Sequence, residues 1–415
     1  MKSYERYCDS SWDFADADTK QFTHCYHTYP AMMIPQVARR LIGEYRPDGR
    51  LQILLDPYMG SGTSLVEASI AGISSIGTDL NPHARMIARV KTSHYDEAAL
   101  RRRLAEMRSN QQNYTEGRVL NRNFDRIYNR NYWYHKETLL KLSFLSQLID
   151  TLEEDADFFR IALSEIVREA SFTRNSEFKR FRMPESKIAK FRPDVFRLFN
   201  EKIDRNLTGL REYNLAATEA AVAIYGFDSS TEIPVEIVPE GSVDMVVTSP
   251  PYGDSRTTVA YGQFSRWANE WFGFENARTL DRLLMGGRKS GTELFRTISI
   301  HEELNVIKEL DAKRYDEVVS FLNDYRNSIR NVATTVRQGG VVCYVVGNRT
   351  VKGIQIPLDY FTAEMFEQCG FEHETTLVRN IPYKRMPSKT SPSNKVGEKV
   401  NTMGCEYIVI MTKRH

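Results

Sequence analysis

The run Ser249-Pro250-Pro251-Tyr252 places a hydroxyl, two prolines and an aromatic ring directly after the apolar segment 243–247. Consecutive prolines hold the backbone in a stiff, extended course and point its carbonyl oxygens in set directions. Such acceptors suit the exocyclic amine of a base, which is a poor nucleophile because its lone pair is delocalised into the ring. The Ser249 hydroxyl and the Pro250 carbonyl would favour a tetrahedral nitrogen, and Tyr252 would stack on the base. The plainer alternative is a proline-stiffened strand exit with a surface tyrosine.

A second candidate site is the run 56–63, Asp-Pro-Tyr-Met-Gly-Ser-Gly-Thr, which follows the apolar segment 51–55. Gly60 and Gly62 would let the backbone approach a ligand closely, and the next helix would offer unpaired N–H groups. Asp79 lies 17 residues after Gly62, at the end of the next short strand, where a carboxylate can accept both hydroxyls of a ribose. The pattern lacks the ending of a phosphate-binding loop, which disfavours a nucleoside triphosphate. A tight turn without a ligand is the alternative.

The elements around these two runs predict an α/β fold. A strand at 51–55, a helix from residue 64 and a strand ending at Asp79 form a β-α-β unit. After residue 236 come a strand at 243–247, a helix from 320 stopped by Gly339 and Gly340, a strand at 341–347, a helix capped by Gly370, and strands at 373–379 and 406–413. Alternation of this kind predicts one parallel-type sheet with helices on both faces, with one antiparallel edge pair among the final strands.

The segment 96–235 differs from the rest of the chain. Its apolar residues recur at helical spacing, and strand patterns are nearly absent. A length of 415 residues also favours two structural units or one core with a large insertion. The sequence therefore predicts an α/β domain made of residues 1–95 and 236–415, interrupted by a mostly helical insertion at 96–235.

The two runs together resemble motifs of the DNA amino-methyltransferases, which modify cytosine N4 or adenine N6. The resemblance implies a Rossmann-like methyltransferase sheet, S-adenosyl-L-methionine as the cofactor, and a target amine held by Ser249, Pro250, Pro251 and Tyr252. Serine in the first place is typical of cytosine-N4 enzymes, whereas asparagine or aspartate is commoner in adenine-N6 enzymes. The implied cofactor-binding residues are Tyr29, Pro30, Asp56, Pro57, Tyr58, Gly60, Gly62, Thr63, Asp79 and Leu80.

Tyr29 and Pro30 belong to the segment 27–42, which resembles the helix that covers the methionine end of the cofactor in that family, with Ile34 and Pro35 at its start. By spacing alone it could equally be an ordinary amphipathic helix. The resemblance does not extend to 96–235, so this insertion becomes the candidate region for recognising the DNA target. The cofactor motif precedes the proline motif here, whereas many enzymes with Ser-Pro-Pro-Tyr have the reverse order.

Double-stranded DNA is the partner that the resemblance implies, and a base must leave the stack to reach such a site. Eight basic residues lie within the 25 residues from Arg168 to Arg192, in a chain with 56 basic and 54 acidic residues in all. A second basic cluster lies at 384–399. Local clusters of this kind suit phosphate binding, although solvated faces are the alternative. The candidate DNA-binding residues are Arg174, Lys179, Arg180, Arg182, Arg256, Lys384 and Arg385.

The five cysteines are scattered and form no CxxC pair, which predicts reduced thiols and no metal site. No signal peptide or long apolar run is present, so a soluble cytoplasmic protein without a membrane partner is expected. A restriction nuclease as companion is compatible with the resemblance, and the oligomeric state stays open.

Three other functions stay open: adenine-N6 methylation of DNA, methylation of an RNA base amine, and DNA binding on a degenerate methyltransferase fold. No hydrolase motif is found. The absence of a Pro-Cys pair disfavours carbon-5 methylation through a cysteine nucleophile. We therefore expect direct in-line transfer to the base nitrogen. Trp267 and Trp271 are predicted to be core residues of a helix that follows the proline motif.

Overall fold

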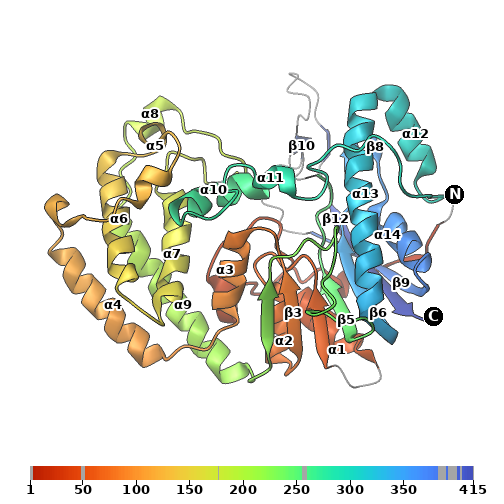
Figure 1. Cartoon of the computed structure of the whole chain (residues 1–415), viewed down its shortest axis with the longest axis horizontal. Coiled ribbons are helices and arrows are strands. Elements are labelled where there is room, and N and C mark those ends of the chain that lie inside the picture. Colours follow the sequence, from red (N-terminus) through yellow and green to blue (C-terminus); the bar gives the residue numbers. More distant parts are fainter. Residues whose placement is uncertain are drawn as a thin grey trace.

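The computed structural model describes residues 3–47, 52–175, 177–254, 259–381, 389–390, 400–401 and 404–414. An eight-stranded sheet with flanking helices lies beside a group of helices from the middle of the chain (Figure 1). The sheet has the order β1-β9-β12-β6-β5-β2-β3-β4. Its strands are β1 (Arg6–Cys8), β2 (Ile53–Asp56), β3 (Ser74–Thr78), β4 (Val222–Tyr225), β5 (Val243–Thr248), β6 (Val336–Val346), β9 (Phe371–Asn380) and β12 (Cys405–Lys413).

Strands β4, β3, β2, β5 and β6 are neighbours and run parallel, which confirms the predicted parallel-type sheet. The last strand, β12, lies between β6 and β9 and is antiparallel to both. The predicted antiparallel pair therefore exists, but it is not the edge of the sheet. The edge strand on this side of the sheet is β1, which pairs parallel with β9.

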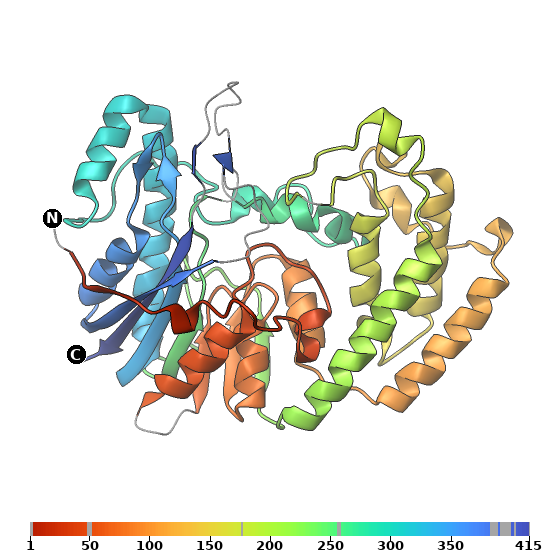
Figure 2. The ribbon, with the colours of Figure 1, turned by 180° about the vertical axis from the view of Figure 1, so that it is seen from behind.

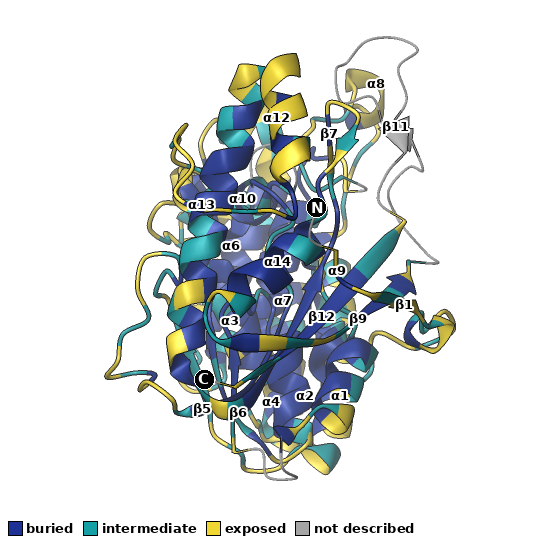
Figure 3. Ribbon diagram, turned by 90° about the vertical axis from the view of Figure 1, so that its right-hand side faces the viewer, coloured by how far each residue is buried: buried dark blue, intermediate teal, exposed yellow. Residues whose placement is uncertain are grey.

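Helices cover both faces of the sheet, as predicted. Alternate residues of β6 point to opposite sides: Cys343 packs in the core below α1 (Pro35–Glu44), and Tyr344 packs in the core below α13 (Ala312–Thr335) and α14 (Leu358–Glu367). Figure 2 shows α1 on its side of the sheet, and Figure 3 shows buried residues following the strands while outer turns of α12 (His301–Leu310) are exposed. The other helices of this part are α2 (Thr63–Ile70) and α3 (Pro82–Lys91).

The junction between α13 and β6 corrects one prediction. The helix ends at Thr335, four residues before Gly339, and β6 begins at Val336. Val336 is fully buried opposite Val243, and the Arg337 guanidinium bonds Asp244, so packing and pairing favour a strand here. Gly339 has a φ of +71° and lies where the β5–β6 register shifts. The glycine pair thus permits an irregularity inside the strand and does not stop the helix.

Residues 97–216, here called the helical region, contain the helices that the sequence predicts for the middle of the chain. They are α4 (Glu97–Gln112), α5 (Arg130–Trp133), α6 (Lys136–Asp150), α7 (Ala156–Glu169), α8 (Glu185–Ile188) and α9 (Val195–Ala216). They enclose a core of their own. The chain then forms β4, which pairs with β3 in the main sheet. The sheet thus resumes at residue 222, before the predicted boundary at 235. The prediction missed this strand because β4 is a half-buried edge strand with a weak apolar pattern.

Two further helices, α10 (Tyr261–Trp271) and α11 (Leu280–Leu283), run across the top of the sheet toward the helical region (Figure 1). Trp267 and Trp271 are fully buried in the helical core, as predicted. Short elements complete the described chain: η1 (Ser10–Trp12), η2 (Phe22–Cys25), η4 (Glu116–Arg118), η5 (Asn123–Arg126), β7 (Thr350–Val351), β8 (Ile354–Gln355), β10 (Lys389–Thr390) and β11 (Val400–Asn401). None of the helices in the described ranges combines the length and apolar character needed to span a membrane.

Candidate active site

The two predicted motifs lie side by side at one edge of the sheet. Strands β2 and β5 are parallel neighbours, so the turn at 56–63 (the glycine turn) and the loop at 249–252 (the proline loop) leave the sheet at the same edge. The Thr248 hydroxyl donates a hydrogen bond to the Asp56 carboxylate, with 2.6 Å between the oxygens. This bond joins the ends of the two strands directly, and the predicted adjacency is confirmed.

Asp56 holds this edge together. Its carboxylate also accepts hydrogen bonds from the Ser64 hydroxyl and from the backbone N–H of Tyr58. Burial nevertheless raises the pKa of Asp56 to about 6, because these hydrogen bonds only partly offset the cost of desolvation. Since both carboxylate oxygens have intramolecular partners, Asp56 ties the glycine turn to β5 and to the start of α2.

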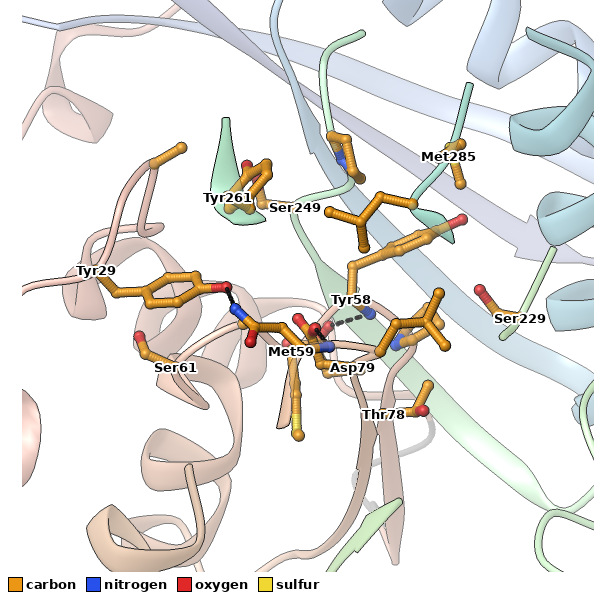
Figure 4. Close-up of a pocket in the computed structure, with 18 of the residues that line it drawn as sticks. Tyr29, Tyr58, Met59, Ser61, Thr78, Asp79, Ser229, Ser249, Tyr261 and Met285 are labelled. Carbon is orange, nitrogen blue, oxygen red and sulfur yellow. Dashed lines mark hydrogen bonds between the residues drawn. The ribbon is translucent and has the colours of Figure 1, made fainter. Parts of the chain in front are cut away.

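A cavity opens between the glycine turn and the proline loop. Figure 4 shows Asp79 at its centre, between Tyr29 and Tyr58, with Ser249 and Tyr261 above. The predicted site residues that line the cavity are Tyr29, Pro30, Asp56, Pro57, Tyr58, Gly60, Thr63, Asp79, Leu80, Ser249 and Pro251. Gly62, Pro250 and Tyr252 lie in the same two loops but are not part of the lining.

Gly62 serves the packing of the turn. Its φ is +76°, and a Cβ added there would stand 2.8 Å from the Cβ of Ala88 in α3. Any other residue would therefore be strained and would push α3 away. The Gly62 N–H also donates to the Met59 carbonyl oxygen at 2.7 Å, which closes the turn.

Asp79 follows β3 at the floor of the cavity. Its carboxylate accepts a hydrogen bond from the Asn81 N–H at 2.7 Å, and the Arg85 guanidinium donates to the Asp79 backbone oxygen. Burial outweighs these contacts and raises the pKa of Asp79 to about 6. The carboxylate is thus a buried acceptor without a salt bridge in the described part of the chain, as a ligand-binding acid would be.

The residues around Asp79 fit a nucleoside-bearing cofactor such as S-adenosyl-L-methionine. The Ser61 hydroxyl lines the cavity, is buried, and has no hydrogen-bond partner among the described residues. Leu80 and Phe227 add apolar surface on the same side. A buried hydroxyl without a partner and a buried carboxylate without a salt bridge are both costly unless a polar ligand bonds to them. The donor and acceptor set therefore suits a ribose with an attached aromatic ring.

The hydroxyl groups of the proline loop form a short chain of hydrogen bonds. Ser249 Oγ lies 3.1 Å from the Tyr252 hydroxyl, which donates to Glu406 Oε1 of β12 at 3.0 Å. Burial, together with the nearby carboxylate of Glu406, raises the pKa of Tyr252 well above its ordinary value. Tyr252 therefore keeps its proton, and its hydroxyl points at β12.

A buried polar network at the cavity was not predicted from the sequence. Asn81 Nδ2 donates to the Tyr29 hydroxyl at 3.0 Å and to Ser265 Oγ of α10 at 2.8 Å. Tyr29 in turn stacks on Tyr261, with ring centroids 6.0 Å apart. Asn81 also caps α3 through the His83 N–H, and the Asn-Pro pair after Asp79 is a helix-start signal that could have drawn attention to it.

Three further lining residues, Phe227, Asp228 and Ser229, follow β4. They were missed because β4 was not recognised as a strand of the sheet. The segment before α1 fits the prediction: Ile34 precedes the helix and Pro35 is its first residue. Tyr29, a few residues earlier, is buried against the helical core.

Three of the four predicted DNA-binding residues of the helical region, Arg174, Arg180 and Arg182, have intramolecular side-chain partners. Arg180 lies over the Trp267 ring, 4.7 Å from its centroid, and burial lowers the pKa of Arg180 to about 10. Arg182 lies over the Tyr132 ring and pairs with Glu185. Arg174 is exposed and 3.4 Å from Glu177, and Lys179 is half-buried. The other three predicted residues, Arg256, Lys384 and Arg385, lie outside the described residues.

Comparison with known proteins gives two type II methyltransferases. The chain is 36% identical to M.MvaI of Kocuria varians over 426 aligned positions, which cover 96% of this chain and 92% of that protein. It is 36% identical to M.MjaII of Methanocaldococcus jannaschii over 101 positions, covering 23% of this chain and 19% of that protein. No family model matches the chain.

Solved structures give weaker likenesses. The rRNA methyltransferase aviRa from Streptomyces viridochromogenes has 10% identity and a TM-score of 0.35, covering 93% of this chain and 88% of that one. The complex of TTHA0409 from Thermus thermophilus with S-adenosyl-L-methionine has 19% identity and a TM-score of 0.22, covering 45% and 54%. The near full-length identity to M.MvaI carries the assignment: the chain belongs to the type II methyltransferases, a family of DNA methyltransferases, and its cofactor is S-adenosyl-L-methionine.

Proposed function

We propose that the chain methylates the N4 amine of a cytosine flipped out of double-stranded DNA. One observation carries this proposal: Ser249 of the proline loop and Asp79 line the same cavity, at a sheet edge joined by the bond between Thr248 and Asp56. An amine held at Ser249 and a nucleoside held at Asp79 would share that cavity. Proximity of this kind can supply much of the acceleration of a group transfer.

On the cofactor side, Asp79 would accept both ribose hydroxyls, and the buried Ser61 hydroxyl would bond to a polar group of the ligand. Tyr29 and Pro30 would cover the methionine end. When bound, S-adenosyl-L-methionine supplies an electrophilic methyl group on a sulfonium. The remaining cofactor residues of this proposal form the glycine turn and its surroundings: Asp56, Pro57, Tyr58, Gly60, Gly62, Thr63 and Leu80.

On the target side, the Ser249 hydroxyl and the Pro250 carbonyl would accept the two amine hydrogens and turn the nitrogen lone pair toward the methyl group. Tyr252 is the proposed stacking partner of the base. The Tyr261 ring, which lines the cavity, is a second candidate for the same role. No cysteine lines the cavity in the described part of the chain, which supports direct transfer to nitrogen.

The helical region is proposed to recognise the DNA target. Helix α10 packs against both α7 of the helical region and α3 beside the cavity, so DNA on this region would lie close to the site. Arg174, Lys179, Arg180 and Arg182 would contact phosphates, and a companion restriction nuclease would fit a protein of this family.

Cytosine is preferred over adenine because the first residue of the proline motif is serine, the form typical of cytosine-N4 enzymes. The test is expression in a host that lacks DNA methylation, followed by mass spectrometry of the nucleosides and sequencing of the modified positions. We expect N4-methylcytosine in a fixed sequence context, absent with the Asp79→Ala variant. N6-methyladenine would move the target to adenine, and a modified base found only in RNA would overturn the DNA proposal.

A further inference from the structure

A row of charged and polar groups stands behind the proline loop. Arg379 in β9 and Glu406 in β12 are directly opposite each other in the antiparallel pair, and their side chains form an ion pair. The other oxygen of Glu406 accepts from the Tyr252 hydroxyl at 3.0 Å, and that hydroxyl lies 3.1 Å from Ser249 Oγ. The row therefore leads from the sheet to the residue proposed to hold the target amine.

Arg379 is fixed in this position. It is buried, and besides the ion pair its guanidinium donates to the backbone oxygens of Trp12 at 2.9 Å and Asp13 at 3.2 Å. A guanidinium can only donate hydrogen bonds, and an ionised carboxylate can only accept them. Arg379 thus determines which group donates and which accepts in each hydrogen bond of the row.

The available protons determine the direction of the hydrogen bond between Ser249 and Tyr252. The single proton of the Tyr252 hydroxyl is used on Glu406, so the Tyr252 oxygen can only accept from Ser249. The Ser249 proton then points away from the cavity, and Ser249 Oγ has no other hydrogen-bond partner among the residues that the structure describes. Its lone pairs remain for a ligand in the cavity that Ser249 lines.

We infer that Glu406 and Arg379 act as positioning residues that fix Ser249 as a hydrogen-bond acceptor, so that the site selects a base carrying an amine over one carrying a carbonyl at the same position. The inference rests on the proposed function, since it concerns the target side of that site. A carbonyl oxygen opposite Ser249 Oγ would bring two acceptors together, and a buried acceptor left without a donor is destabilising.

Replacing the Glu406 carboxylate by an amide exchanges the donor and acceptor roles of Tyr252 and Ser249. In Glu406→Gln, the amide oxygen must face Arg379, which only donates, so the amide nitrogen faces Tyr252. Tyr252 then accepts from the amide and donates to Ser249, and the Ser249 proton turns toward the cavity. The variant should bind an amine less well and a carbonyl better, although its shape is nearly unchanged.

The experiment compares two DNA duplexes that contain the methylated sequence found for the wild type, one with the target cytosine and one with uracil in its place. Affinities for both are measured with wild type and Glu406→Gln in the presence of the demethylated cofactor, S-adenosylhomocysteine. We expect the cytosine-to-uracil affinity ratio to fall roughly 10-fold or more in the variant. The energy needed to open each base pair cancels, because both proteins receive the same two duplexes.

Two variants make the result specific. Tyr252→Phe keeps the ring but removes the relaying hydroxyl, so it should lower the same ratio, and Glu406→Gln should add nothing further to it in the double variant. Glu372→Gln removes an exposed carboxylate of β9, paired with Arg414, and should leave the ratio unchanged. Cofactor affinity, measured by calorimetry, should stay within about twofold in all of them and reports correct folding, an outcome that simple damage to the loop would not give.

An unchanged ratio in both Glu406→Gln and Tyr252→Phe would overturn the inference, and so would additive losses in the double variant. If the wild type modifies adenine, only the cytosine proposal is wrong. The role of Glu406 and Arg379 is then tested with hypoxanthine in place of adenine. A wild type that modifies cytosine while Glu406→Gln keeps the full ratio defeats the relay only. The two failures are thus separable.

Discussion

Carboxylates at the sheet edge and carboxylates in the helical region have opposite pKa shifts. Burial raises the pKa of Asp56 and of Asp79 to about 6. In the helical region, burial opposes ionisation of Glu165, but His27, Arg205 and Lys202 hold its pKa at about 2. Hydrogen bonds from Arg211 and Arg101 likewise lower the pKa of the half-buried Glu97 to about 2.

The difference separates a region whose buried carboxylates are paired with cations from one whose buried carboxylates are not. Glu165 accepts from Arg205 at 2.9 Å and lies 3.3 Å from the Lys202 ammonium, so the helical region satisfies its own charges. Asp79 lines a cavity, and its hydrogen bonds and the charge of Arg85 only partly offset the cost of burial; the Ser61 hydroxyl, in the same lining, has no partner among the described residues. Strongly perturbed groups in a cavity are candidates for function, whereas paired charges more often serve the fold.

The largest effect is expected from Asp79→Ala, which removes the carboxylate at the cavity floor. Losing two charge-assisted hydrogen bonds to ribose hydroxyls should weaken cofactor binding by about 4 kcal/mol, or roughly 1,000-fold in Kd. In the wild type, affinity should fall as the pH drops below about 6, because a protonated Asp79 no longer accepts from both hydroxyls. Titration calorimetry measures both effects, with Glu97→Gln as a control that keeps full affinity. An unchanged Kd in Asp79→Ala would rule out the ribose assignment.

A smaller effect is expected from Glu165→Gln, which breaks a completed pair. Burial lowers the pKa of His27 to about 4, so His27 is neutral at pH 7. The variant removes the carboxylate that pairs with Arg205, while Lys202 keeps its ion pair with Glu169 at 2.9 Å. The free energy of unfolding should fall by about 2–3 kcal/mol near pH 7. Because the pKa of Glu165 is lowered on folding, its contribution is complete above about 4.5 and is lost as the pH falls toward 2.

Denaturant unfolding of both proteins at pH 7 and pH 3.5 checks this. The difference between wild type and Glu165→Gln should be smaller at the lower pH. A difference that grows on acidification would contradict the view that the helical region satisfies its own charges.

The smallest effect concerns basic residues of the helical region. The Arg182 side chain contacts Tyr132, Phe172 and Glu185, whereas the Lys179 side chain has no partner among the described residues. Lys179→Ala should reduce the slope of log affinity for duplex DNA against log salt by about 0.9, the value for one phosphate contact. Arg182→Ala should change that slope less and should instead lower stability by about 1 kcal/mol. Fluorescence anisotropy across a salt series measures both slopes. Equal slopes for the two variants would contradict the view that Lys179 is more available to DNA than Arg182.

Local patterns explain what could be predicted from the sequence. The glycine turn and the proline loop each depend on a few consecutive residues after an apolar strand, and parallel neighbours bring such ends to one edge. Strand β4 was not predicted because its four residues are half-buried. Phe227 and the residues after it, which line the cavity, were therefore missed as well.

Longer-range contacts explain what was missed. The bond between Tyr252 and Glu406 spans 154 residues, and the place of β12 between β6 and β9 has no local signature. The aromatic contacts of Arg180 and Arg182 could not be predicted either, because only the tertiary structure determines the positions of those rings.

The way the helical region is inserted has a thermodynamic consequence. It leaves the sheet after β3 and returns at β4, and these two strands are hydrogen-bonded neighbours whose ends, Asp79 and Phe227, both line the cavity. The Thr78 hydroxyl donates to the Phe227 carbonyl oxygen at 2.8 Å and locks those ends together. A molecule that shifts the helices would therefore strain the cavity that Asp79 and Phe227 line. By linkage, whatever factor DNA imposes on cofactor affinity the cofactor must impose on DNA affinity.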